Sequence, residues 1–198
     1  MYRRLAQALG WLLLSTGLVA PSVWATTYTI DPNHTTVAFK IRHLFSYVQG
    51  TFNAFEGTVE YEPDKPQLWN ATATIQATSI DTRVEKRDQH LRSKDFFDVE
   101  QFPTIMFTTT QVTDATPTGA KLHGLLTIHG VEKPVILDLT IHGAGKDPWG
   151  NVRAGFTATT TINRKDFGLA WNQVLESGQL LVGEEVEITL DVEAVAQE

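Results

Sequence analysis

Cysteine is absent from this chain of 198 residues. Its absence excludes disulfides, thiol nucleophiles, a lipidated N-terminal cysteine, and zinc or iron–sulfur sites with cysteine ligands. Small exported domains often depend on disulfides for their stability. A folded domain of this sequence must therefore be stabilised by its core alone.

An apolar run long enough to cross a membrane is missing from the N-terminus. The apolar stretch there covers residues 5–19, which is shorter than the ~20 residues that a membrane span needs. Arg3 and Arg4 precede it, and Val23-Trp24-Ala25 supplies small residues suited to cleavage. This layout is typical of a secretory signal peptide. We therefore expect residues 1–25 to be removed on export to the periplasm.

Basic residues are few in the remaining domain, residues 26–198. The expected signal peptide holds two of the sixteen basic residues and none of the 23 acidic ones, so the domain carries fourteen basic against 23 acidic groups, a formal charge of −9. An acidic surface repels nucleic-acid phosphates and anionic lipid head groups. We expect no nucleic-acid partner and no stable membrane insertion after signal cleavage.

Catalytic motifs are also missing. The sequence contains no His-Glu-x-x-His, no Gly-x-Ser-x-Gly and no glycine-rich phosphate loop. Asp88 and His90 lie in a charged cluster, where a structural ion pair is the expected role. We predict that the protein is not an enzyme and has no catalytic or metal-binding residues. The alternative is a metal-assisted periplasmic hydrolase that uses His34, His43 and nearby carboxylates.

Alternation of apolar and polar residues dominates the domain. Residues 37–43, 135–142 and 185–194 each place apolar side chains on one face and mostly polar ones on the other. This period of two indicates half-buried antiparallel strands. Weaker alternation extends over residues 68–80, 104–113, 121–129 and 152–162. About eight strands with few helices predict an all-β antiparallel barrel, since closure removes exposed sheet edges.

Glycine and proline divide these strands. We expect a turn over residues 130–134 and another over Asp147-Pro148-Trp149-Gly150. Residues 47–61 read as one long strand, in which Gly50 and Gly57 are expected to mark a bend or bulge.

Two stretches break the strand pattern. Thr82-Arg83-Val84-Glu85 resembles a capping box and predicts a short helix that extends through Arg92. Residues 163–183 form a long connection rich in apolar side chains. Such a connection is expected to plug the barrel end or to act as a lid that contacts a ligand, and both interpretations remain open.

Several ordered blocks of residues together form a family signature. They are Asp31-Pro32-Asn33-His34, Gly50-Thr51-Phe52, Ile80-Asp81-Thr82, Arg87-Asp88-Gln89-His90-Leu91-Arg92-Ser93, Asp95-Phe96-Phe97-Asp98, Gly124-x-Leu126-Thr127-Ile128-His129-Gly130 and Asn163-Arg164-Lys165-Asp166-Phe167-Gly168-Leu169. Through these blocks the domain resembles the YceI-like family of periplasmic polyisoprenoid-binding proteins over essentially its whole length.

The resemblance implies an eight-stranded antiparallel lipocalin-like barrel with short helical segments in its loops. It also implies a carrier that holds a polyisoprenoid, an isoprenoid quinone or a similar long-chain amphiphile non-covalently, with no covalent cofactor. A homodimer and a barrel whose core is simply filled by side chains remain alternatives. From strand parity we expect the ligand to contact Phe39, Ile41, Phe52, Phe107, Leu126, Ile128, Leu137, Leu139, Phe156, Phe167 and Trp171.

Overall fold

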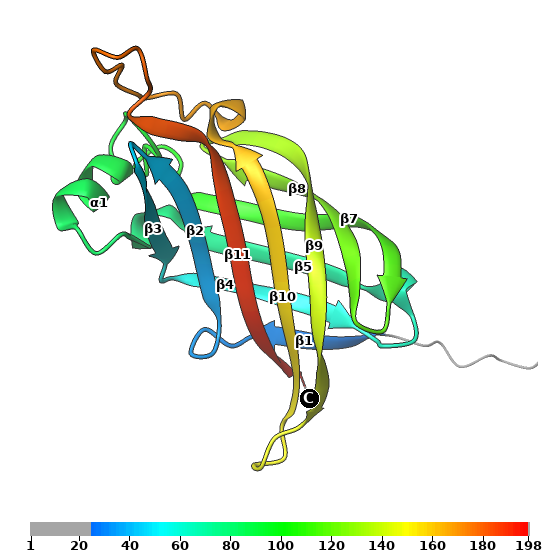
Figure 1. The fold of residues 1–198 in the computed structure, drawn as a ribbon. Helices are drawn as coiled ribbons and strands as arrows, with labels where there is room; N and C mark the ends of the chain where they lie inside the picture. The colour runs from blue at the N-terminus through cyan, green and yellow to red at the C-terminus, as the bar shows by residue number, and fades with distance from the viewer. Residues whose placement is uncertain (1–24, 198) are drawn as a thin grey trace, which may run out of the picture.

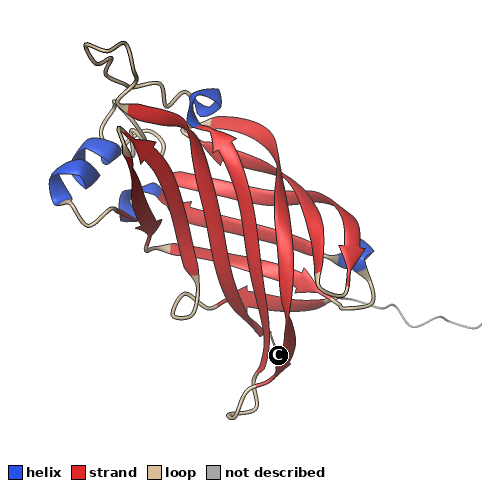
Figure 2. Ribbon diagram, in the orientation of Figure 1, coloured by secondary structure: helices blue, strands red, loops and turns tan. Residues whose placement is uncertain are grey.

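The computed structural model describes residues 25–197, so the expected signal peptide lies outside the described residues except for Ala25. Strands dominate the chain, and three short 3-10 helices and one α-helix lie in the connections (Figure 2). The strands are β1 (Thr26–Ile30), β2 (Thr36–His43), β3 (Ser46–Phe52), β4 (Phe55–Tyr61), β5 (Asn70–Gln76), β6 (Ile80–Asp81), β7 (Thr104–Thr116), β8 (Gly119–Ile128), β9 (Val131–Lys146), β10 (Val152–Asn163) and β11 (Val182–Ala196). The helices are η1 (Pro66–Leu68), η2 (Ala77–Ser79), α1 (Glu85–Arg92) and η3 (Arg164–Phe167).

The strands close into an antiparallel barrel (Figure 1). Eight of them form a ring in the order β1, β4, β5, β7, β8, β9, β10 and β11, and pairing of Tyr28 with Ala196 helps to join the last strand to the first. This closed ring confirms the predicted eight-stranded antiparallel barrel, and it leaves no free edge along β1 or β11 where the two pair.

Two long strands of the barrel are interrupted: one consists of β1 and β2, and the other of β3 and β4. The same edge of β11 pairs with β1 through Ala194–Ala196 and with β2 mainly through Val186–Asp191, so the chain bends between β1 and β2. A second break, at residues 53–54, separates β3 from β4. The predicted single strand over residues 47–61 is therefore wrong at its centre.

Gly50 and Gly57 lie within β3 and β4, not at the break that we expected them to mark. Each is needed because another atom approaches closely. A Cβ atom at position 57 would lie 2.4 Å from the carbonyl oxygen of Thr72, and one at position 50 would lie 2.4 Å from Cζ of Phe39. These glycines make room for neighbouring strands and side chains, as glycine in a sheet often does.

The turn between β8 and β9 is shorter than predicted. It consists of His129 and Gly130, both with positive φ, and Pro134 already lies inside β9 opposite Leu125. Proline is tolerated there because the pairing of β9 with β10 ends at Asp138, which leaves that side of β9 unpaired. The predicted turn at residues 147–150 is confirmed, with the Gly150 amide donating to the Asp147 carbonyl at 3.0 Å.

Helix α1 ends at Arg92, as predicted, but it is not capped as predicted. Its N-cap residue is Val84, which provides no side-chain cap. The Thr82 hydroxyl and backbone amide both donate to the carboxylate of Asp88, which is only 3 % exposed. The Thr82 hydroxyl thus donates to a carboxylate and does not cap the helix by accepting from one of its amides, so Asp88 holds the segment that leads into α1.

The barrel interior is filled at one end by an aromatic plug. The ring of Tyr61 packs at 5.1 Å from that of Trp69 and edge-on at 5.2 Å from that of Phe156. The other members of this buried cluster are Tyr28, Ala120, Ile141, Ala154 and Ala194. These residues come from β1, the start of β8, β9, the start of β10 and the end of β11, at the end of the barrel where β1 lies (Figure 1).

Candidate functional site

A cavity of about 330 Å³ occupies the part of the barrel away from the aromatic plug. Its volume falls within the usual range of small-molecule sites. Its wall is almost entirely apolar because the inward positions of the strands carry aliphatic and aromatic side chains. The cavity reaches the end of the barrel at which α1 and the connection between β10 and β11 lie (Figure 1).

Eight of the eleven predicted ligand contacts line this cavity. They are Phe39, Ile41, Phe52, Phe107, Leu126, Ile128, Leu137 and Trp171. Seven belong to strands in which alternate residues face inward, and Trp171 belongs to the connection after η3.

Leu139, Phe156 and Phe167 are not part of the cavity wall. Phe156 faces the interior but belongs to the aromatic plug, and Leu139 packs against the same cluster. Phe167, at 2 % exposure, is buried in η3 among core residues. Alternation along a strand identifies the face of a side chain but not its depth along the barrel axis, which is why Leu139 and Phe156 were grouped with the cavity residues.

Apart from Trp171, the prediction did not name the wall residues that come from outside the long strands. Leu91 of α1 and the adjacent Phe96 and Phe97 line the cavity, as do Leu169 and Leu181 of the connection before β11. Two neighbouring phenylalanines in a polar, irregular segment were the signal that could have identified this part, because exposed loops rarely carry such pairs.

An aromatic cluster links the α1 segment to the β10–β11 connection. The ring of Trp171 lies 4.9 Å from that of His90 and 5.1 Å from that of Phe96. Nε2 of His90 lies 2.8 Å from an oxygen of Asp95. His90 thus holds two irregular segments together over the cavity. Asp88 is bound to Thr82, so the contacts of both residues support the structural role that we expected for this cluster.

The cavity wall contains a few polar side chains, of which Arg164 is the most buried at 3 % exposure. Its Nε donates to the carbonyl oxygen of Gly183 at 2.8 Å, and Nη1 donates to the carbonyl oxygen of Leu169. These bonds fix the start of η3 to both ends of the β10–β11 connection. Burial lowers the pKa of Arg164 from its ordinary value.

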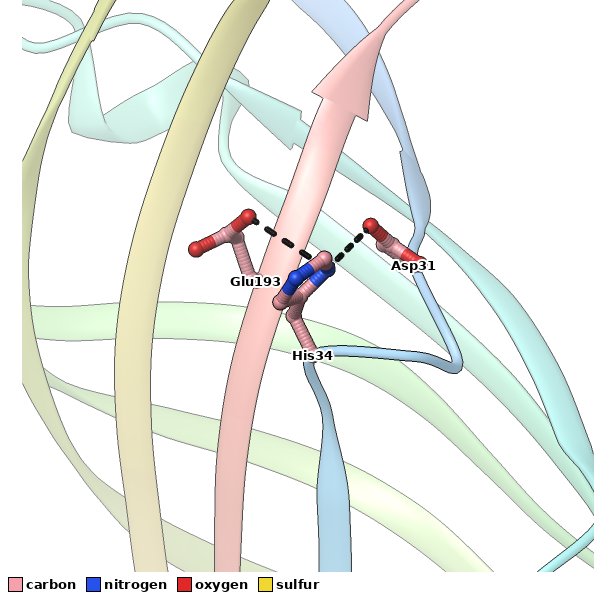
Figure 3. A group of neighbouring side chains, drawn as sticks. All are labelled: Asp31, His34 and Glu193. Carbon is pink, nitrogen blue, oxygen red and sulfur yellow. Dashed lines mark hydrogen bonds and ion pairs between the residues drawn. The ribbon is translucent and has the colours of Figure 1, made fainter. Parts of the chain in front are cut away.

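A second polar cluster contains Asp31, His34 and Glu193 (Figure 3), none of which lines the cavity. Nδ1 of His34 is 2.8 Å from Asp31 and 3.9 Å from Glu193. Nη1 of Arg153 is 2.9 Å and 2.6 Å from the same two carboxylates, and its Nε is 2.8 Å from Asp147. Hydrogen bonds from His34 and Arg153 hold the pKa of Asp31 well below its usual range.

This geometry does not support a metal site shared by His34 and His43. His34 precedes β2 and His43 is its last residue. Because an extended strand rises about 3.3 Å per residue, the two histidines lie at opposite ends of β2, too far apart to bind one metal ion. His43 lines the cavity, whereas His34 is exposed. The carboxylates beside His34 already have a cationic partner in Arg153.

No helix within residues 25–197 is long and apolar enough to cross a membrane.

A closed antiparallel barrel, plugged at one end and hollow and apolar at the other, defines a lipocalin-like β-barrel protein. Residues 28–194 match the model of the YceI-like domain, so the chain belongs to the YceI-like family.

Relatives of this family match the chain closely in sequence. A UPF0312 protein of Pseudomonas savastanoi pv. phaseolicola is 41 % identical over 167 residues, which cover 83 % of this chain and 85 % of the relative. Another, from Ectopseudomonas mendocina, is 37 % identical over 196 residues, 98 % of this chain and 100 % of the relative.

Solved structures share the fold. The Campylobacter jejuni YCEI protein has a TM-score of 0.68 and 29 % identity, over 80 % of this chain and 91 % of its own. Burkholderia cenocepacia BcnA has a TM-score of 0.74 and 23 % identity, over 83 % and 99 %. A polyisoprenoid binding domain from Saccharophagus degradans has a TM-score of 0.64 and 14 % identity, over 87 % and 99 %.

Proposed function

We propose that this protein binds a polyisoprenoid, an isoprenoid quinone or a similar long-chain amphiphile non-covalently in the barrel cavity. The observation that carries the proposal is an apolar cavity of about 330 Å³, walled by inward side chains and closed at one end by the aromatic plug. The name of the Saccharophagus degradans domain, whose fold is similar, points to the same class of ligand.

The chemistry of the wall suits this ligand. Burial of apolar surface contributes ~0.8 kcal/mol per methylene group, so about ten buried methylene groups contribute a gross ~8 kcal/mol before the costs of association. A ligand held in this way needs few polar contacts. The sparse polar lining therefore favours binding over catalysis as the function.

The site of action in this proposal is the periplasm. Its support is the charged, apolar and small-residue pattern of residues 1–25, together with the acidic balance of the rest of the chain. A protein of this kind would carry its ligand between membranes or partners in aqueous solution, as a monomer or a homodimer.

Native mass spectrometry of protein purified from the periplasm tests the proposal directly. We expect a mass above that of the chain without residues 1–25, and organic extraction should release a long-chain amphiphile. The same spectrum reports whether the protein is a monomer or a dimer. Protein that carries no such compound and also fails to bind prenyl quinones in vitro would overturn the proposal.

A further inference from the structure

One nitrogen of the Arg164 guanidinium is left without a partner after folding. Nε and Nη1 bind the carbonyl oxygens of Gly183 and Leu169, but Nη2 has no hydrogen-bond partner within the described chain and is sealed from solvent. Buried donors in folded proteins are nearly always paired, and an unpaired one on a charged group is especially unfavourable.

Arg164 also has no ion-pair partner within the described residues. Glu184, whose charge acts on Arg164, is bound to Lys165 at 2.5 Å. Arginine stays protonated even when burial lowers its pKa. A full positive charge therefore lies in the wall of an apolar cavity with only neutral carbonyl partners.

Two other polar side chains of the wall, Arg87 and His90, have hydrogen-bond partners. Nε and Nη2 of Arg87 donate to the hydroxyl and carbonyl oxygens of Thr82, and His90 is engaged with Asp95. Within residues 25–197, Nη2 of Arg164 is the one side-chain polar atom that is sealed from solvent and has no hydrogen-bond partner.

We propose that the cavity selects an amphiphile whose head group carries an anionic oxygen, a carboxylate or a phosphate, and that this oxygen accepts a hydrogen bond from Nη2 of Arg164. The inference rests on the proposed function, because it places the chain of the amphiphile in the cavity. A charge-assisted hydrogen bond to such an oxygen would satisfy the donor and neutralise the charge together.

Access to Nη2 requires a small movement of the wall. Leu169 and Trp171 line the same cavity and belong to the connection between η3 and β11. The Leu169 carbonyl is itself bound to Arg164, so displacement of this connection frees a second donor beside Nη2. The head group reaches the guanidinium when this connection shifts.

The test compares ligands that differ only in the head group. Delipidated protein is titrated at neutral pH with geranylgeraniol, geranylgeranoic acid and geranylgeranyl phosphate, and binding is followed by calorimetry. Because hydrogen bonds to charged groups stabilise more than neutral ones, we expect at least one anion to bind roughly tenfold more tightly than the alcohol. Which anion does so identifies the head group.

Two variants assign the preference to Arg164. Arg164→Met removes the charge and is expected to abolish the preference for the anion while the alcohol still binds. Lys40→Met removes a positive charge from the outer face of β2, where Lys40 binds Glu187, and should leave the preference unchanged. If Arg164→Met does not fold, the wild-type comparison of acid with alcohol still decides whether the head group is anionic.

The outcomes separate this inference from the proposed function. Equal binding of alcohol and anions by the wild-type protein would overturn the anionic head group and leave the lipid-binding function intact. A preference that survives in folded Arg164→Met would likewise overturn the role of Arg164. Failure of all three probes to bind would overturn the proposed function itself.

Discussion

The ring of Phe39 lies directly over Gly50 on the neighbouring strand. The two residues are paired across β2 and β3, and a Cβ atom at position 50 would lie 2.4 Å from Cζ of the ring. The ring of Phe107 lies over Gly124 diagonally, since Gly124 pairs with Thr109, and a Cβ atom at position 124 would lie 2.4 Å from Cε2 of this ring. Two aromatic rings of the cavity wall thus depend on the missing side chain of a facing glycine.

Gly124→Ala should push the ring of Phe107 toward the cavity. Overpacking of this kind typically costs about 1–3 kcal/mol. We expect a lower free energy of unfolding in urea and weaker binding of long-chain ligands. Gly145→Ala is the control, since nothing lies within 4 Å of its added Cβ. Equal behaviour of the two variants would show that the close contact at Gly124 does not limit the cavity.

Phe107→Asp should abolish lipid retention, whereas Thr108→Asp should not. Phe107 lines the cavity, where an unpaired charge costs several kcal/mol, and Thr108 is exposed on the outer face of β7. Circular dichroism checks folding, and mass spectrometry counts bound lipid. Loss of lipid from the Thr108 variant alone would contradict the placement of these side chains.

Trp171→Ala should speed ligand release. The substitution removes two aromatic contacts, with His90 and Phe96, that join the irregular segments over the cavity. At about 0.5–1.5 kcal/mol each, their loss should raise the dissociation rate roughly tenfold. Trp149, 83 % exposed in the β9–β10 turn, provides the control variant Trp149→Ala. An unchanged rate would indicate that this connection plugs the barrel without gating it.

The Arg153 cluster should make stability depend on acidity. Hydrogen bonds from Asn151 and Arg153 lower the pKa of Asp147, and those from His34 and Arg153 lower that of Asp31. A lowered folded-state pKa stabilises the protein above the ordinary aspartate value, near pH 4, and this stabilisation is lost as the pH falls further.

Urea unfolding between pH 7 and pH 3 measures this effect. Wild-type protein should lose stability below about pH 4. Arg153→Met should be less stable at pH 7 and show a smaller further loss in acid, because a partner that lowers both pKa values is gone. Parallel curves for the two proteins would mean that Arg153 does not carry the dependence.

Sequence patterns predicted the barrel and the faces of its strands because side-chain direction alternates with a period of two. Phe107 and Thr108 illustrate this, as one lines the cavity and the other is exposed. The same rule could not separate Phe107 from Phe156, since both face inward and only the closure of the barrel decides which end each occupies.

The partners of individual side-chain donors and acceptors could not be predicted from the sequence. The carboxylate of Asp88 draws Thr82 away from the helix cap that its spacing suggests. The unpaired Nη2 of Arg164 emerges only when η3, Gly183 and Leu169 are brought together. A local sequence pattern does not show which buried donor binds which acceptor, or which donor is left without one.

The aromatic plug turns the barrel into a sleeve with a blind end. A ligand must enter and leave by the same opening, so the last carbon atoms to go in are the first to come out. Each isoprene unit that fits inside adds to affinity, while any unit beyond the depth of the sleeve stays in water and adds nothing. Affinity should therefore rise with chain length and then level off, and the length at which it does so measures the depth that Tyr61, Trp69 and Phe156 set.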